Sequence, residues 1–73
     1  LNIIGHTDSD GDNDFNLDLS KRRAMSVKNS LTSDFGIDDN QLSFEGKGET
    51  EPSDDNNTTK GKANNRRVEF VKM

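Results

Sequence analysis

Cysteine, tryptophan and tyrosine are absent from the 73 residues, and proline occurs once. Without cysteine, no disulfide can stabilise the fold. Hydrophobic residues make up only 26% of the chain. No run of more than three apolar residues occurs, which excludes a membrane-spanning helix. So small an apolar content cannot fill a large core. The composition is compatible with a piece of a larger domain, a marginally stable small domain or a partly disordered chain.

The first residues also lack the features of a signal peptide, because no basic region and no long apolar run is present. The sequence does not begin with methionine, so we interpret it as a piece of a longer protein. Its net charge of −4 argues against general nucleic-acid binding, which requires a basic face. The charges are nevertheless segregated, with five Asp in residues 8–18 and four basic residues in 60–67. This segregation allows a local site for a zwitterionic ligand.

Hydrophobic periodicity and turn residues predict alternating strands and helices. The helix expected over 16–33 has Asn16 as its N-cap, a stripe of small and apolar residues on one face, and Gly36 at its C-terminal end. In the last strand, Val68 and Phe70 are expected to point inward. A turn is expected at 46–48. The complete expectation is strands at 1–5, 41–46 and 67–72, and helices at 16–33 and 58–64, with loops between them.

A strand, a long helix and a second strand in sequence are typical of a βαβ unit with parallel strands. In such a unit the loop after the first strand and the start of the helix are neighbours, so Asp8 and Arg23 can face one cleft. From spacing alone, the pair can equally be an ordinary surface salt bridge or two independent solvated charges.

Catalytic and metal sites find little support in the sequence. His6 is the only histidine, so a zinc site or a Ser/His/Asp arrangement is not indicated, and a structural role beside the strand end is expected. The aspartates of residues 8–14 resemble a calcium loop, with Gly11 at the sixth position. That alignment puts His6 first and Leu17 twelfth, where calcium ligands are required. We therefore expect neither an enzyme nor a cofactor.

Four motifs together resemble the OmpA-like peptidoglycan-binding domain of the OmpA, Pal and MotB family. They are Gly-His-Thr-Asp-Ser-x-Gly at 5–11, Asn-x-x-Leu-Ser-x-x-Arg-Ala-x-x-Val at 16–27, Gly-x-Gly-Glu-x-x-Pro at 46–52, and Asn-x-Thr-x-x-Gly-Lys-x-x-Asn-Arg-Arg-Val-Glu at 56–69. Lys62 replaces the family's usual arginine. The resemblance covers essentially the whole chain in order, but the family's first strand and helix are missing. It implies an α+β fold, a two-layer sandwich with helices packed on one face of a mixed sheet, so that residues 1–73 are a partial domain.

The resemblance also implies a function and a set of site residues. The family binds the meso-diaminopimelate residue of the peptidoglycan stem peptide without covalent chemistry, which tethers an outer-membrane or envelope protein to the cell wall of a diderm bacterium. Asp8 would hold the ligand's ammonium group and Arg23 its carboxylate, assisted by Arg66. The remaining implied contacts are hydrogen bonds from Thr7 and Asn16 and an apolar contact from Leu19. The expected location is the periplasm or the outer-membrane-associated envelope.

Two alternatives remain open at this point. The Asp8–Asp14 loop can be a calcium-binding module, or the chain can be an inert structural fragment that has lost its site with the missing segment. The resemblance implies peptidoglycan as the partner, and no nucleic-acid partner is expected. Contact with a membrane is expected only through a missing segment of the parent protein. The sequence indicates neither the oligomeric state nor the type of parent protein.

Overall fold

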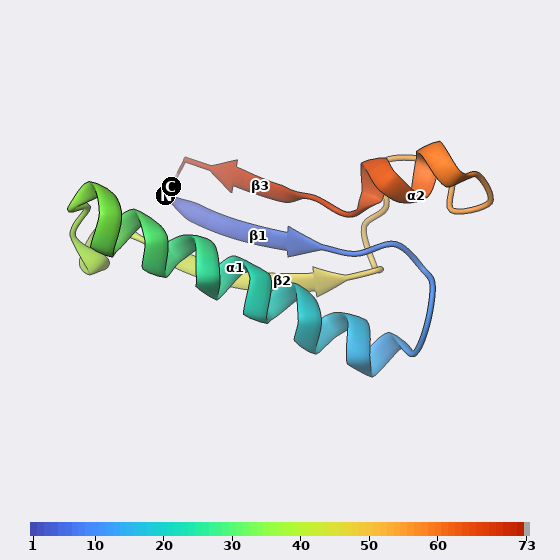
Figure 1. Ribbon diagram of the computed structural model, residues 1–73, viewed down its shortest axis with the longest axis horizontal. Helices are drawn as coiled ribbons and strands as arrows, with labels where there is room; N and C mark the ends of the chain where they lie inside the picture. The colour runs from blue at the N-terminus through green and yellow to red at the C-terminus, as the bar shows by residue number, and fades with distance from the viewer. Residues whose placement is uncertain (73) are drawn as a thin grey trace.

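The computed structural model describes residues 1–72, which form one mixed sheet and two α-helices (Figure 1). The order of the strands is β2-β1-β3, with β1 parallel to β2 and antiparallel to β3. The α+β fold with a mixed sheet and the parallel βαβ pairing are therefore confirmed. The elements are β1 (Asn2–His6), α1 (Asn13–Phe35), a 3₁₀ turn η1 (Asp39–Gln41), β2 (Ser43–Gly48), α2 (Thr59–Asn65) and β3 (Val68–Val71).

Helix α1 packs its small and apolar stripe on the sheet, as the periodicity predicts. Ala24 is fully buried against Ile3 of β1 and against Leu42, and Val27 and Leu31 pack around this small core. Gly36 ends the helix in the left-handed region, with a φ of 67°. That conformation strains a residue that has a Cβ, which explains why glycine stands there.

The start of α1 differs from the prediction. The helix begins at Asn13 with Asp12 in the N-cap position, so the expected N-cap Asn16 lies inside the first turn. Asn16 is buried, and its side chain donates hydrogen bonds to the preceding loop instead of capping the helix. Although α1 has 23 residues, neither it nor the other helix within residues 1–72 is apolar enough to cross a bilayer.

Glycine lets α1 lie unusually close to the sheet. A Cβ on Gly5 would overlap the carbonyl oxygen of Ser20, and a Cβ on Gly46 would lie 2.5 Å from the backbone nitrogen of Lys21. Strand β2 continues to Gly48, so the turn expected at 46–48 is wrong. Gly46 lies within this strand, where it faces α1. The close approach also brings the Ser20 hydroxyl oxygen within 2.9 Å of the Gly48 backbone N–H, which donates to it.

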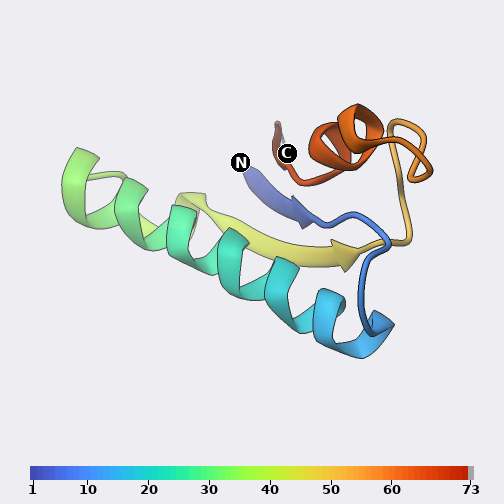
Figure 2. The ribbon, with the colours of Figure 1, turned by 45° about the vertical axis from the view of Figure 1, so that its right-hand side comes forward.

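The third strand lies beyond the cover of α1. Ile3 pairs with both Phe44 and Phe70, so these side chains share the face that α1 occupies. Figure 2 shows α1 beneath β2, with β3 farther away, and Phe70 is consequently 55% exposed. Phe70 therefore points to the expected inward face but is not covered there, whereas Val68, which pairs with Gly5 nearer the helix, packs against the core.

Candidate functional site

The loop between β1 and α1 is held in a defined conformation by its own side chains. The Thr7 hydroxyl donates to the Asp8 carbonyl oxygen at 2.9 Å, and the Asp8 carboxylate accepts the Asp10 backbone N–H at 3.0 Å. The Asn16 amide donates to the carbonyl oxygens of Asp10 at 2.8 Å and Asp8 at 3.4 Å. Thr7 and Asn16, both predicted to offer hydrogen bonds to a ligand, therefore direct their donors into the loop.

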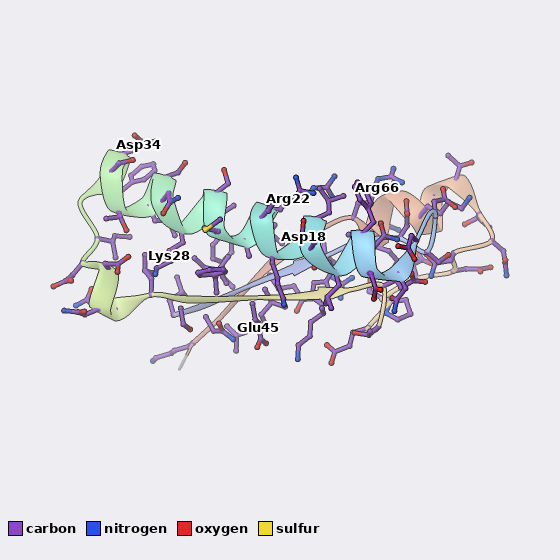
Figure 3. All side chains as sticks on the ribbon, turned by 90° about the horizontal axis from the view of Figure 1, so that it is seen from below. Asp18, Arg22, Lys28, Asp34, Glu45 and Arg66 are labelled. Carbon is purple, nitrogen blue, oxygen red and sulfur yellow. The ribbon has the colours of Figure 1, made fainter. Side chains whose placement is uncertain are left out.

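Asp8 forms an ion pair with a residue that is distant in sequence. Its carboxylate Oδ2 accepts a hydrogen bond of 2.6 Å from Nη1 of Arg66, which follows the last residue of α2. The Asp8 side chain is only 10% exposed, whereas that of Arg66 is 44% exposed. This bond joins the end of α2 to the loop between β1 and α1, and Figure 3 labels Arg66 at this end of the molecule.

Beside this ion pair lies an open cavity of about 380 Å³, lined by Arg23, Arg66, Arg67 and Val68. Within residues 1–72, Arg23 has no hydrogen-bond or ion-pair partner. Arg67, by contrast, donates to Glu69 at 2.7 Å and to two backbone carbonyl oxygens. Arg23 is thus an uncommitted guanidinium that faces the cavity, which suits it to bind an anion.

Asp8 and Arg23, which were predicted to face one cleft, are linked only through a third residue. Arg66 bonds Asp8 and lines the same cavity as Arg23, so the three charged groups lie on one side of the molecule. Leu19 is half-buried and precedes Arg23 by four residues on α1, a spacing that puts both on one face of the helix. The structure therefore joins Asp8 to Arg66 and places Arg66 and Arg23 along one cavity, while Leu19 lies one helical turn before Arg23 on α1.

Sequence reasoning missed Asn65, which is fully buried. Its side-chain oxygen accepts the backbone N–H groups of Ser53 and Asp54, and its amide donates to the Asp54 carbonyl and to Asn56. This network fixes the loop before α2 and thereby the helix end from which Arg66 extends. The only signal in the sequence is its place in the Asn-Arg-Arg motif.

His6 has the structural position that the sequence predicts. It is buried at the end of β1, with Nε2 3.6 Å from a Glu69 carboxylate oxygen, beyond ordinary hydrogen-bond length. Burial and the positive charge of Arg67 lower the pKa of His6, although Glu69 and Glu51 oppose this shift. The lowered pKa favours the neutral form of the side chain beside the ion pair of Arg67 and Glu69.

The aspartate loop does not assemble into a metal site. Asp8 is engaged with Arg66, and Asp10 forms an ion pair of 3.1 Å with Lys62 of α2. In the described part of the chain, residues 1–72, no three acidic or histidine side chains converge closely enough to hold a metal ion. Nothing in this arrangement favours the calcium alternative.

The ion pair makes the stability of the fold dependent on pH. Burial alone would raise the pKa of Asp8, but the hydrogen bonds from Arg66 and the Asp10 backbone outweigh it and lower the pKa below the ordinary 3.8. A carboxyl with a lowered folded pKa stabilises the fold above its unfolded pKa, and that contribution is lost as the pH falls through the folded pKa. We therefore expect urea denaturation to show a lower free energy of unfolding at about pH 3 than at about pH 5.

The matching control is Asp8→Asn, which removes the titrating group. Asp54 and Glu69 also have lowered pKa values, so some pH dependence will persist in the variant. The decrease between the two pH values should nevertheless be smaller than in the original chain. An equal decrease in both proteins would contradict a contribution from Asp8.

Comparison with known proteins assigns the family. The OmpA family model matches residues 1–66. The chain belongs to the OmpA family. It is 52% identical over 67 residues to the outer membrane protein A of Bordetella avium, an alignment that covers 92% of this chain and 34% of that protein. The chain thus spans about a third of this curated relative.

Solved structures agree with this family assignment. The fold superposes on the peptidoglycan-associated lipoprotein of Burkholderia pseudomallei with a TM-score of 0.90 and 33% identity, covering 96% of this chain and 58% of that one. It also matches the cell wall anchor of the type VI secretion system (T6SS) from Pseudomonas aeruginosa, with a TM-score of 0.78 and 33% identity, covering 92% and 50%. By name these are an outer membrane protein, a lipoprotein and an anchor. The predicted location in the outer-membrane-associated envelope of a diderm bacterium agrees with them.

Proposed function

We propose that residues 1–73 are part of a peptidoglycan-binding domain that recognises meso-diaminopimelate in the stem peptide without covalent chemistry. Binding would tether an outer-membrane or envelope protein to the cell wall. The names of two solved relatives, a peptidoglycan-associated lipoprotein and a cell wall anchor, support peptidoglycan as the ligand. The charges of the site support the choice of diaminopimelate, whose side chain ends in an ammonium and a carboxylate on one carbon.

Each charged residue has a role that its surroundings support. Asp8 accepts the ligand's ammonium group, because its carboxylate bonds Arg66, which lines the cavity together with Arg23. Arg23 binds the ligand's carboxylate, since its guanidinium is uncommitted and can form two parallel hydrogen bonds. Arg66, which bonds Asp8 and lines the cavity with Arg23, assists at the carboxylate. No covalent step is required, so the protein acts as a binding module and not as an enzyme.

The uncharged residues set the register of the ligand. Leu19 contacts the aliphatic part of diaminopimelate, because it lies one helical turn from Arg23 on the same face of α1. Thr7 and Asn16 hold the loop that carries Asp8, and hydrogen-bond capacity left after those internal bonds is available to the ligand. The observation that carries the proposal is the unpaired Arg23 guanidinium beside the Asp8–Arg66 ion pair.

Sedimentation with isolated sacculi tests the proposal. The original chain should sediment with sacculi, and free meso-diaminopimelate should release it. Asp8→Asn should weaken binding about tenfold, because a neutral amide oxygen replaces a charged acceptor for the ammonium group. Far-UV circular dichroism checks that the variant is folded. Unchanged sedimentation of folded Asp8→Asn would show that Asp8 does not hold the ligand, and sedimentation that free diaminopimelate cannot compete would reject diaminopimelate as the recognised group.

A further inference from the structure

The carboxylate proposed to receive the ligand's ammonium group is already occupied. Asp8 Oδ2 accepts the 2.6 Å hydrogen bond from Arg66, and Oδ1 accepts the Asp10 backbone N–H. The Asp8 side chain is nearly buried, so little further room exists around the carboxylate. An arriving ammonium group therefore has to share Asp8 with the Arg66 guanidinium or displace it.

We infer that Arg66 is a specificity-determining residue, which competes with the ligand's ammonium group for Asp8 and yields only to a ligand whose carboxylate can receive the displaced guanidinium. This inference rests on the proposed function and adds a discriminating role to the same site. A ligand with both charges exchanges one ion pair for two. A ligand that has only an ammonium group replaces the Asp8–Arg66 ion pair with its own and leaves Arg66 without an anionic partner.

The attachment of Arg66 is suited to such an exchange. Within residues 1–72 its guanidinium makes a single hydrogen bond, to Asp8, and the side chain is 44% exposed. The open cavity beside it gives the guanidinium space to turn. The neighbouring Arg67, which donates to Glu69, Glu51 and Asn65, lacks this freedom.

The position of Arg23 explains why the exchange needs a carboxylate. A guanidinium that leaves Asp8 for the cavity approaches the unpaired Arg23, which also lines it. Two cations brought together in this way repel each other unless an anion lies between them. The ligand's carboxylate supplies that anion, so Arg66 leaves Asp8 readily only when the carboxylate has entered.

Two synthetic stem peptides isolate this effect. One contains meso-diaminopimelate, and the other has lysine in its place, which keeps the terminal ammonium group and lacks the carboxylate beside it. For Arg66→Gln we expect about tenfold weaker binding of the diaminopimelate peptide and about threefold or more tighter binding of the lysine peptide, because Asp8 is then free. Calorimetry or NMR titration of the full 73-residue chain measures both affinities.

Two further variants serve as controls. Arg66→Lys keeps a cation for Asp8, so the lysine peptide should bind as weakly as it binds the original chain. Arg22→Gln removes the same charge from an exposed position of α1, where Arg22 pairs with Asp18, and should change neither affinity. Circular dichroism of each variant establishes that it is folded, and in folded Arg66→Gln the pKa of Asp8 should rise.

The outcomes separate this inference from the proposed function. Binding of the diaminopimelate peptide with no gain for the lysine peptide in Arg66→Gln would overturn the competitive role and leave the proposed function intact. Equal weakening of both peptides would also overturn it, because Arg66 would then only support the fold. If the original chain bound neither peptide, the proposed function would fail. In that case, binding of the lysine peptide by Arg66→Gln would still support competition between Arg66 and an ammonium group for Asp8. Absence of that binding would reject the competition as well.

Discussion

Arg23→Ala is expected to weaken binding to isolated sacculi about 100-fold, because it removes the cation that we propose as the partner of the ligand's carboxylate. The same change should leave the fold intact. Arg23 has no intramolecular hydrogen bond or ion pair among residues 1–72 whose loss could destabilise the protein. Sedimentation at several protein concentrations gives the affinity, and thermal unfolding followed by circular dichroism gives the stability.

Arg22→Ala is the matched control for this prediction. It removes the same side chain from the adjacent position of α1, where Arg22 forms an exposed ion pair of 2.8 Å with Asp18, and such a pair contributes little to stability. Its binding to sacculi should equal that of the original chain. Equal losses in the two variants would mean that net positive charge, and not a specific contact of Arg23, attaches the chain to the cell wall.

Gly5→Ala is expected to destabilise the fold by roughly 3 kcal/mol, enough to unfold a small domain in large part. The added methyl group would overlap the backbone carbonyl oxygen of Ser20, and no side chain can rotate away to relieve the contact. The helix would have to move off β1, which opens the core around Ile3 and Ala24. Urea denaturation monitored by circular dichroism measures the loss.

Gly11→Ala gives the comparison that isolates this steric effect. Nothing lies within 4 Å of a Cβ at Gly11, so only its φ of 87° opposes alanine. We expect a destabilisation of about 1 kcal/mol, typical of a left-handed residue other than glycine. A Gly5→Ala variant as stable as Gly11→Ala would show that α1 can shift from the sheet without loss, contrary to the packing described.

Local patterns in the sequence were sufficient for the elements whose side chains pack in a regular period. The spacing of Ala24, Val27 and Leu31 predicted which face of α1 meets the sheet, and Gly36 predicted its end. The strand–helix–strand order predicted the parallel pairing of β1 and β2. The helix expected at 58–64 is observed as α2, where Thr58 is the N-cap and its hydroxyl accepts the Gly61 backbone N–H.

Contacts between distant segments could not be predicted in the same way. The Asp8–Arg66 ion pair joins residues 58 positions apart, and it depends on how the Asn65 network holds the end of α2. The start of α1 was misplaced because Asn16, a good N-cap residue, has acceptors available in a loop whose path the sequence does not reveal. Phe70 points to the predicted face but remains exposed, because periodicity gives the face of a strand and not the extent of the helix above it.

The Asn16 amide has a consequence for the way in which a ligand is received. Its hydrogen bonds to the carbonyl oxygens of Asp8 and Asp10 fix the loop between β1 and α1 before any ligand arrives. Conformational entropy that a mobile loop would lose on association is then lost during folding instead. Under the proposed function, the cell wall would meet a pre-organised acceptor, and a short segment with few contacts would then retain useful affinity.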